Sequence, residues 1–587
     1  MPTSLIDADS LLAIDVGGVN TRAMLFDVVD GRYRFMAMGS APTTANAPYH
    51  DISEGVRAAL DRLQTVAGRT LVGPDERLIV PSTVDGTGVD SIVATLSAGP
   101  PLQVVALGLL EDVSLESACR LATTTYARVV DRISLNDHRK PEARLDSILR
   151  LRPNLILAAG GTEGGASQSV IRLLEAVGLA CYLLPENQRP ELLFTGNQAL
   201  QDEIKATLGK ITPLRFAPNL RPSLEVEQLE AAQSYLAGIF RTVRGHQIPG
   251  VDELNTWAGN GLLPTATAFG RVIRYLRELS KEADPNRGVF GIDVGASATT
   301  VAASFSGEVN LGVYPYLGLG ENLAEFLEHA RVEEVIRWLP MVATESQLRE
   351  YICTKALYPA SIPVTAEDLA FEQALARQAM RVAVRNISSS FPSRIRHYGE
   401  ELLPGFEPIV ASGSVLTRAP SLAQSLLMLL DGVQPTGITT VWLDQNHLMP
   451  ALGAAAAVNP LLAVQVIDSS TFLNLGTVIT PVSNVRPGTP VLRLNMTAEN
   501  GAETALEVRQ GSLEMLPLPF GQSARLQVTP LHGADVGMGR PGRGGGVRVI
   551  GGALGLVVDA RGRPLRLSND PERRAEAFKK WLWTFGA

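Results

Sequence analysis

Cysteine, aromatic residues and excess positive charge are all scarce in this sequence of 587 residues. The three cysteines, Cys119, Cys181 and Cys353, are odd in number and far apart, which argues against a disulfide framework and favours a reducing compartment. The net charge of −8 shows no excess of positive charge of the kind that binds nucleic acid. No run of about 18 apolar residues is present, and the opening residues MPTSLIDADS lack the basic segment of a signal peptide. These absences predict a soluble cytoplasmic protein with neither a nucleic-acid nor a membrane partner.

Spacings typical of zinc ligands are also missing, since the sequence contains neither HExxH nor CxxC. The sequence therefore does not predict a zinc site. Apolar residues, in contrast, are plentiful at 45% of the chain, which is enough for sizeable cores. At about 150 residues per domain, the length predicts roughly three or four folded units.

The order of strand-like and helix-like segments predicts an α/β fold. Residues 11–40 have the pattern of three short strands, and a helix is expected at 53–67. Short apolar runs then alternate with helical patterns as far as about residue 200, and one run, ACYLLP at 180–185, is expected to be a strand. Alternation of this kind is typical of a largely parallel sheet flanked by helices.

The opening pattern restarts at residue 289, where VFGIDVG, TTVAASFSG and EVNLGVYPYLG again have the pattern of three consecutive strands. From residue 461 the chain changes to short strands separated by turn residues, and it ends in one helix beginning near Asp570. We therefore expect a first lobe at 11–285, a second lobe at 286–460 and a β-rich C-terminal domain at 461–587.

Each lobe opens on the same phrase, AIDVGGVNTR at 13–22 and GIDVGASATT at 291–300. In both, a strand ends in an aspartate, Asp15 or Asp293, and then turns through glycine. Glycine lets backbone N–H groups approach phosphate oxygens, whereas the carboxylate would hold Mg²⁺, usually through water. Two such loops on opposing lobes predict a clamp on the β- and γ-phosphates of a nucleotide.

A third element with small side chains is PIVASGSVLTRAP at 408–420, which has the pattern of a strand, a tight turn and a helix. A nucleobase or ribose can lie against backbone of this kind. Helices rich in small residues at 263–276 and 449–458 would allow the lobes to approach closely at a hinge. Ordinary tight packing is the alternative interpretation of each segment.

GGTEGG at 160–165 follows an expected strand and precedes an expected helix, so it is a candidate anion-binding loop. The residues concerned are Gly160, Gly161, Thr162, Gly164 and Gly165. A plain turn between strand and helix is the alternative.

These residues resemble the actin-like ATPase superfamily, which includes sugar kinases, heat-shock ATPases and actin. The resemblance implies two duplicated ribonuclease H-like lobes with ATP or ADP and Mg²⁺ between them. It assigns catalysis to Asp15 and Asp293, both also holding Mg²⁺ through water. It assigns nucleotide binding to Gly17, Gly18, Val19, Asn20, Thr21, Gly295, Ala296, Ser297, Thr299, Thr300, Ser412, Gly413 and Ser414.

Within that superfamily the chain is similar to the glutamate (methylaspartate) mutase accessory proteins. The segments that carry this similarity include RYRFMAMGSAPTT, LRPNLILAAGGTEGGAS, LFTGNQALQDEI and VWLDQNHLMPALG. Proteins of this family are regarded as ATP-dependent reactivators of adenosylcobalamin-dependent mutases. The resemblance implies that this chain binds mutase subunits and uses ATP to release damaged cobalamin, and it does not extend to 461–587.

Three positions depart from the family pattern. Arg22 stands where lysine is usual, Ala296 replaces a glycine, and Ser412 replaces another. Alanine is strained where the backbone φ is positive, so phosphate contact would weaken if that loop required such a φ. Slow hydrolysis, or nucleotide binding without turnover, therefore remains open.

Two other functions stay in view. A small-molecule kinase on the same fold would need a base beside the acceptor hydroxyl, and no single residue identifies itself as that base. The third hypothesis is a nucleotide-binding scaffold that does not hydrolyse ATP. The sequence leaves open which mutase is served, the oligomeric state and the role of the C-terminal domain.

Overall fold

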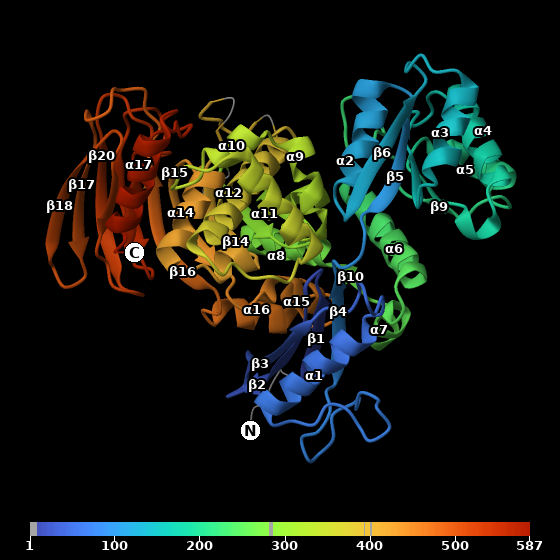
Figure 1. Ribbon diagram of the computed structural model, residues 1–587, viewed down its shortest axis with the longest axis horizontal. Coiled ribbons are helices and arrows are strands. Elements are labelled where there is room, and N and C mark those ends of the chain that lie inside the picture. The colour runs from blue at the N-terminus through green and yellow to red at the C-terminus, as the bar shows by residue number, and fades with distance from the viewer. Residues whose placement is uncertain (1–8, 281–285, 393, 400–401, 587) are drawn as a thin grey trace.

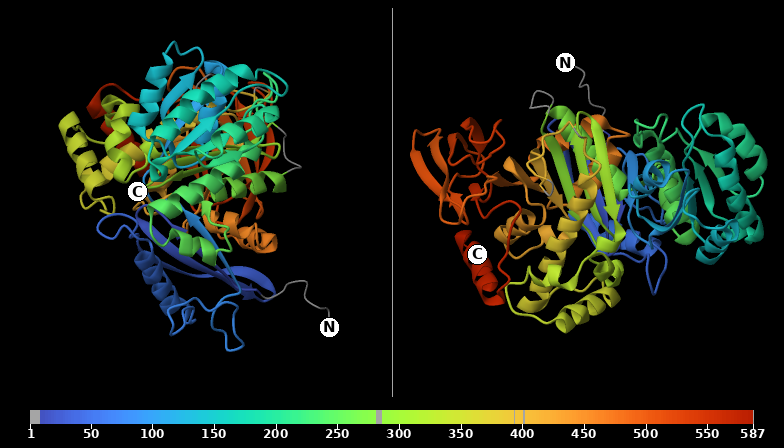
Figure 2. Two further views of the ribbon diagram at one scale, coloured as in Figure 1. Left: turned by 90° about the vertical axis from the view of Figure 1, so that its right-hand side faces the viewer. Right: turned by 90° about the horizontal axis from the view of Figure 1, so that it is seen from above.

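The computed structural model describes residues 9–280, 286–392, 394–399 and 402–586. Its two lobes are stacked in Figure 1, with an α/β domain beside them on one side and a β-rich unit on the other, and Figure 2 shows two further views. Within the described ranges, no helix is both long and apolar enough to cross a membrane.

The first lobe is built on a five-stranded sheet in the order β10-β4-β1-β2-β3. Its strands are β1 (Leu11–Val16), β2 (Asn20–Val29), β3 (Arg32–Pro42), β4 (Ser91–Leu96) and β10 (Leu263–Pro264). β1 pairs antiparallel with β2 and parallel with β4, and all six of its residues are buried. Helix α1 (Ser53–Ala67) has the predicted bounds and packs on β3 through an apolar face that includes Leu60 and Leu63.

The second lobe repeats this arrangement in the first five strands of an eight-stranded sheet, in the order β13-β12-β11-β14-β15. The strands are β11 (Gly288–Val294), β12 (Thr299–Phe305), β13 (Glu308–Tyr314), β14 (Phe406–Ser412) and β15 (Gly437–Leu443). β11 pairs antiparallel with β12 and parallel with β14, as β1 does with its own neighbours. The expected two-lobed, actin-like α/β fold is therefore confirmed.

Two helices rich in small residues join the lobes, as their composition indicated. α8 (Thr265–Leu279) and α15 (Leu448–Ala455) pack against each other. A Cβ atom added to Gly453 would lie 1.9 Å from the carbonyl oxygen of Ala268, so this crossing requires glycine.

Helices cover the remaining faces of the second lobe. They are η4 (Pro315–Leu317), η5 (Glu321–Glu325), α9 (Phe326–His329), α10 (Val332–Ile336), α11 (Glu345–Leu357), α12 (Ala366–Ser388), α13 (Ser414–Thr417) and α14 (Leu422–Gly432). The fully buried Trp338 lies in their shared apolar core and donates its indole N–H to Gln378 Oε1 at 3.0 Å.

An α/β domain is inserted between β4 and β10 of the first lobe. Its five parallel strands have the order β6-β5-β7-β8-β9, with bounds β5 (Leu102–Gly108), β6 (Ala127–Ser134), β7 (Leu155–Ala158), β8 (Glu191–Phe194) and β9 (Leu214–Phe216). The helices of this segment are η1 (Glu111–Leu115), α2 (Glu116–Ala122), α3 (Pro141–Leu151), α4 (Gln168–Leu183), η2 (Glu186–Gln188), η3 (Gln198–Leu200), α5 (Gln201–Leu208), α6 (Glu230–Gln247) and α7 (Val251–Trp257).

The strand expected at 180–185 is wrong, because residues 180–183 form the last turn of α4. Val177, Ala180, Cys181 and Leu184 are buried at a helical spacing, whereas Tyr182 is exposed. A short apolar run does not distinguish the end of a buried helix from a strand, and here the longer helical period decides.

The strands after residue 460 divide between two sheets. β16 (Leu473–Thr480), β22 (Leu556–Asp559) and β19 (Leu513–Leu516) extend the sheet of the second lobe beyond β15. β18 (Glu503–Arg509), β17 (Pro490–Ala498), β20 (Ser523–Pro530) and β21 (Gly545–Ile550) form a separate antiparallel sheet, and α16 (Pro460–Asp468) and α17 (Pro571–Thr584) complete the segment. The sheet of the second lobe therefore crosses the boundary expected between residues 460 and 461.

A buried ionic network also joins the two sides of that boundary. Asp431 of α14 accepts from Arg377 of α12 and from Arg561, each at 2.8 Å. Arg561 also binds Asp559 at 2.9 Å, and Arg563 binds the same carboxylate at 2.7 Å. None of these five side chains is more than 5% exposed, so the network fixes the C-terminal segment to the core of the second lobe.

Candidate functional site

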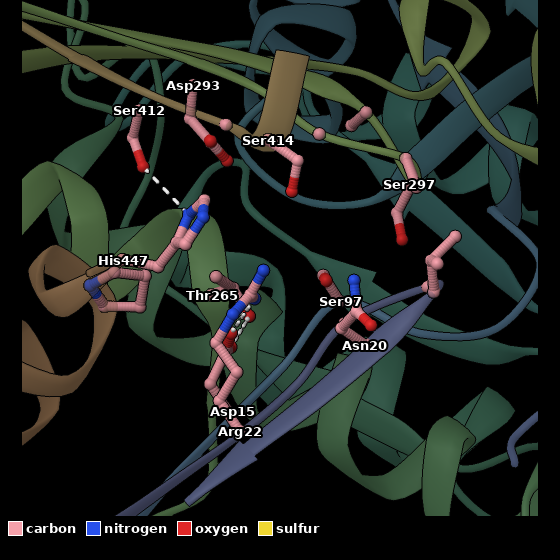
Figure 3. A pocket seen from close by; sticks show the side chains of 18 of the residues that line it. Asp15, Asn20, Arg22, Ser97, Thr265, Asp293, Ser297, Ser412, Ser414 and His447 are labelled. Carbon is pink, nitrogen blue, oxygen red and sulfur yellow. Dashed lines mark hydrogen bonds and ion pairs between the residues drawn. The ribbon is translucent and has the colours of Figure 1, made fainter. Parts of the chain in front are cut away.

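A cavity between the lobes collects most of the residues that the sequence singled out (Figure 3). The first lobe and its insertion contribute Asp15, Gly17, Gly18, Val19, Asn20, Arg22, Ser97, Tyr126 and Thr265 to its lining. The second lobe contributes Asp293, Gly295, Ala296, Ser297, Ala298, Ser412, Gly413, Ser414, His447 and Pro450. The two repeated phrases and the serine–glycine turn therefore meet at one place.

Asp15 lies near the end of β1, and its neighbours in the sheet hold it. In the register of the strands it is opposite Arg22 on β2 and Thr95 on β4. Thr95 donates its hydroxyl to Asp15 Oδ1 at 2.7 Å, Thr265 donates to the same oxygen at 3.1 Å, and Arg22 lies 3.4 Å from Oδ2. The carboxylate is therefore fixed in direction before any ligand binds.

Asp293 occupies the equivalent position on β11, opposite Thr300 of β12. Burial raises the pKa of the Asp293 carboxyl to about 7. The positive charge of Arg22 lowers this pKa, whereas the negative charges of Asp15 and Asp444 raise it. Two strand-end aspartates thus share one cavity but have different surroundings.

The glycine turns after the two aspartates close with the same hydrogen bond. Gly17 donates its N–H to the Asn20 carbonyl at 2.9 Å, and Gly295 donates to the Ala298 carbonyl at 3.0 Å. A Cβ atom on Gly18 would lie 2.5 Å from Ser297 Oγ, so the two turns touch across the cleft.

Ala296 does not suffer the strain that a positive φ would impose, because it is not among the described non-glycine residues with positive φ. It packs instead against a later turn, where a Cβ atom on Gly320 would lie 3.0 Å from the Ala296 side chain. The alanine in place of glycine is therefore compatible with the backbone of this loop.

Three of the predicted contact residues lie beneath the loops rather than in the cavity lining. Thr21 is fully buried and forms a hydrogen bond of 2.7 Å with Thr43, whose hydroxyl lies 2.7 Å from the Gly17 carbonyl. Thr299 donates to the Leu317 carbonyl at 2.8 Å. Thr300 is buried in β12. These side chains support the turns from behind.

The serine–glycine turn after β14 requires its glycine. Gly413 has a φ of +103°, and a Cβ atom there would lie 2.2 Å from the Val294 carbonyl oxygen. The hydroxyl of Ser412 lies 3.4 Å from His447 Nδ1, and that of Thr417 lies 3.4 Å from His447 Nε2. Burial lowers the pKa of His447 well below its ordinary value, and the charge of Arg22 adds to the effect. The imidazole is therefore neutral at pH 7.

Asp444 is a third carboxylate near this cavity, and it is fully buried. Its two oxygens accept from the backbone N–H groups of Leu448 and Met449, each at 2.9 Å, at the start of α15. Burial raises the pKa of Asp444 to about 6, and the helix N–H groups and Arg22 lower it. Arg22 is thus the cation that faces three acidic side chains.

Sequence reasoning missed Thr95, Thr265, Asp444 and His447, because their place at the site depends on strand register and helix packing. A partial signal existed in VWLDQNHLMPALG, where an aspartate precedes a helix of small residues.

The donor set suits a hydrated Mg²⁺ that also touches phosphate oxygens, because two carboxylates and several hydroxyls converge. Within the described ranges, no group of three or more His, Cys, Asp or Glu side chains is arranged to hold a metal by itself. The protein alone would therefore supply an incomplete shell, which phosphate oxygens and water would complete.

The GGTEGG loop lies elsewhere, in the inserted domain between β7 and α4. Gly161 and Gly164 have φ values of +73° and +69°, so these turns favour glycine. The carboxylate of Glu163 accepts from Asn219 Nδ2 at 2.8 Å and from the Gln198 N–H at 3.4 Å. The chain's own acid thus uses donors that an external anion would use, and anion binding here stays a prediction.

Residues 11–471 match the family described as MutL protein. A relative from Clostridium tetanomorphum, Protein MutL, is 24% identical over 469 residues, and the match covers 74% of this chain and 98% of the relative. Among solved structures, ethanolamine utilization protein EutJ from Carboxydothermus hydrogenoformans is 9% identical, with a TM-score of 0.25, over 77% of this chain and 90% of that chain. A diol dehydratase-reactivating factor in nucleotide-free form is 10% identical, with a TM-score of 0.28, over 78% of this chain and 99% of that chain. Because the family match spans most of its length, this chain belongs to the MutL protein family.

Proposed function

We propose that this protein is an ATP-dependent reactivating chaperone for an adenosylcobalamin-dependent mutase of the glutamate mutase type. In this role it binds the mutase and releases damaged cobalamin. Membership of the MutL family and the similarity to mutase accessory proteins support the partner. The observation that supports nucleotide binding is that two strand-end aspartates and two glycine turns from opposite lobes meet at one cavity.

The turns after Asp15 and Asp293 would cradle the β- and γ-phosphates through backbone N–H groups, which need no side chain. The turn at Ser412, Gly413 and Ser414 would receive the adenosine. Mg²⁺, bound through water to Asp15 and Asp293, would neutralise charge on the transferring phosphoryl group. Arg22, which contacts Asp15, would lie close to the phosphates and would also neutralise part of their negative charge.

Hydrolysis, rather than binding alone, would draw on the different surroundings of the two aspartates. Asp15, held by Thr95 and Thr265, would keep its direction. Asp293 lines the same cavity and would help to orient the attacking water.

The contact between the two turns links nucleotide to movement. Because Gly18 and Ser297 touch, phosphates can enter between the turns only if the lobes separate. Binding and hydrolysis would therefore change the angle between the lobes, and a partner that spans both lobes would feel that change.

The test is a reactivation assay with an inactivated mutase, Mg-ATP and fresh adenosylcobalamin. We expect the wild-type protein to restore mutase activity with ATP and to fail with a non-hydrolysable analogue. Asp15→Asn and Asp293→Asn should each lose reactivation while still associating with the mutase. Asp30→Asn is the matched control, because Asp30 lies in the exposed β2–β3 turn at a φ of +52° that asparagine accepts.

The alternative functions give different results in the same experiment. A small-molecule kinase would yield a phosphorylated product with no dependence on a mutase. A non-hydrolysing scaffold would bind ATP in calorimetry without releasing phosphate. Absence of ATP and ADP binding at millimolar nucleotide would contradict all three nucleotide-based functions.

A further inference from the structure

The edge of the second lobe's sheet opens into a groove away from the nucleotide cavity. β13 is the last strand at this edge, and Val313 donates its N–H outward to the Thr123 carbonyl of the inserted domain at 2.7 Å. In an antiparallel ladder, alternate residues direct their backbone groups to the same side. Leu311 and Val309 therefore direct theirs outward as well, and their N–H groups have no hydrogen-bond partner within the described part of the chain.

The groove runs between the inserted domain and the second lobe, which Figures 1 and 2 place beside each other. One wall comes from α2, β6 and residues 225–233, and the other comes from β13, Tyr316 and residues 386–392. Its volume of about 1420 Å³ exceeds the roughly 300–1,000 Å³ of small-molecule pockets. A polypeptide segment fits its size better than a metabolite does.

Two acidic side chains of this groove carry a charge that no neighbouring arginine among the described residues neutralises. Its lining contains five glutamates and two arginines, namely Glu116, Glu225, Glu227, Glu230, Glu308, Arg120 and Arg132. Both arginines are already bound to glutamates of the same wall, Arg120 to Glu227 at 2.9 Å and Arg132 to Glu116 at 3.1 Å. Two arginines outside the lining neutralise further glutamates, Arg221 at Glu227 and Arg274 at Glu230. Within the described ranges, Glu225 and Glu308 are the lining acids that form no ion pair. The groove is therefore complementary to a positively charged occupant.

The two faces of β13 differ in chemistry. The side chains of Val309 and Leu311 lie on one face, where a Cβ atom on Gly270 of α8 would meet each of them at 3.6 Å. Glu308 and Asn310 lie on the other face, because successive side chains of a strand alternate. A strand added at this edge would meet apolar atoms on one face and an acidic side chain on the other.

We propose that this groove binds an extended segment of a partner protein, which adds a strand to the free edge of β13 and carries basic and apolar residues in alternation. Backbone hydrogen bonds to Val309 and Leu311 would supply affinity, and the alternating side chains would supply specificity. The proposal does not depend on the nucleotide site or on the identity of the mutase.

The walls of the groove belong to different lobes, so a bound segment would respond to the angle between them. The ion pair between Arg128 of β6 and Glu325 of η5, at 2.7 Å, joins the inserted domain to the second lobe. Together with the bond between Val313 and Thr123 it connects the two walls.

The test measures amide hydrogen exchange in the full-length protein with the peptide acetyl-(Lys-Val)₄-amide and with acetyl-(Glu-Val)₄-amide at equal concentration. We expect the Lys–Val peptide to slow exchange at the N–H groups of Val309 and Leu311 and the Glu–Val peptide to leave it unchanged. If the Lys–Val peptide at millimolar concentration does not slow exchange at these two amides, or if both peptides slow it equally, the proposal fails.

Two variants separate the contribution of the backbone hydrogen bonds from that of the acidic side chain. Leu311→Pro removes one outward N–H without cutting the pairing with β12 and should weaken binding of the Lys–Val peptide at least about tenfold, as for the loss of about 1.4 kcal/mol. Leu311→Ala keeps the N–H and is its control. Glu308→Lys should weaken binding by about two- to fivefold, whereas Glu175→Lys, an exposed acid on α4, should not.

If Leu311→Pro does not fold, the exchange experiment on the wild-type protein and on Glu308→Lys decides the question alone. Unchanged affinity in both a folded Leu311→Pro and Glu308→Lys would overturn the proposal. A concentration-dependent dimer that Leu311→Pro abolishes would assign the edge to a second copy of this chain and would also overturn it.

Discussion

Replacing Asp293 with asparagine should stabilise the protein in the absence of nucleotide. Burial raises the pKa of Asp293 to about 7, compared with about 3.9 in an unfolded chain. The folded state therefore holds the proton more tightly than the unfolded state does. At neutral and alkaline pH, ionisation of this carboxyl opposes folding, and asparagine removes that opposition while keeping the shape of the side chain.

The size of the effect follows from the shift in pKa. Three units at 1.36 kcal/mol per unit give an upper limit of about 4 kcal/mol, and solvent in the cavity reduces this to about 1–3 kcal/mol. The favourable contribution of protonated Asp293 is complete below about pH 4 and is lost as the pH rises through 7. The stability gained by Asp293→Asn should therefore be absent at pH 4, grow up to pH 7 and remain constant above it.

Asp15→Asn is the matched comparison and should have the opposite sign. It leaves the partly buried Arg22 side chain without its ion pair to this carboxylate and weakens the bonds from Thr95 and Thr265, at a cost of about 1–3 kcal/mol. Urea unfolding of both variants from pH 4 to 8 measures the difference. If Asp293→Asn is no more stable than the wild-type protein at pH 8, our account of the surroundings of Asp293 is wrong.

Three further outcomes are expected. Asp431→Asn should lower the free energy of unfolding by about 3–5 kcal/mol in urea titrations, because it leaves the buried Arg377 without its carboxylate partner, and an unchanged value would contradict this role. Truncation after residue 460 should give no folded product by circular dichroism, because it strips β16 from β15, and a folded, ATP-binding fragment would show that the sheet is not needed. Gly413→Ala should weaken ATP binding in calorimetry at least about tenfold through backbone strain, as for a loss of 1.4 kcal/mol. Gly31→Ala, at another positive φ in open space, is the control that should leave the ATP affinity unchanged.

The repeated phrases were predictable because their chemistry is local. A strand that ends in aspartate and turns through glycine is written within ten residues, and both copies open a sheet in the order that the sequence indicated. The repetition also made the second lobe predictable, because each copy of the phrase is followed by two further strands in the same hairpin order.

The partners of these aspartates could not be predicted in the same way. Thr95 reaches Asp15 only because β4 pairs with β1 in one particular register, and Thr265 does so only because α8 begins at the end of β10. The boundary expected after residue 460 cuts through one sheet for a similar reason. The sequence pattern of a strand such as β16 does not reveal which sheet the strand will join.

The insertion of the α/β domain between β4 and β10 has a consequence for how the chain folds during synthesis. The sheet of the first lobe gains its last strand only after residues 97–262 have been made, yet the inserted domain has its own sheet and, on one face of that sheet, an apolar core that the first lobe does not share. The inserted domain can therefore fold on the ribosome while the first lobe still waits for β10. Residues Leu263 and Pro264 then close the sheet beside Thr95 and Leu96, and this late step also brings Thr265 to Asp15. The nucleotide site thus depends on residues that are synthesised only after the whole inserted domain.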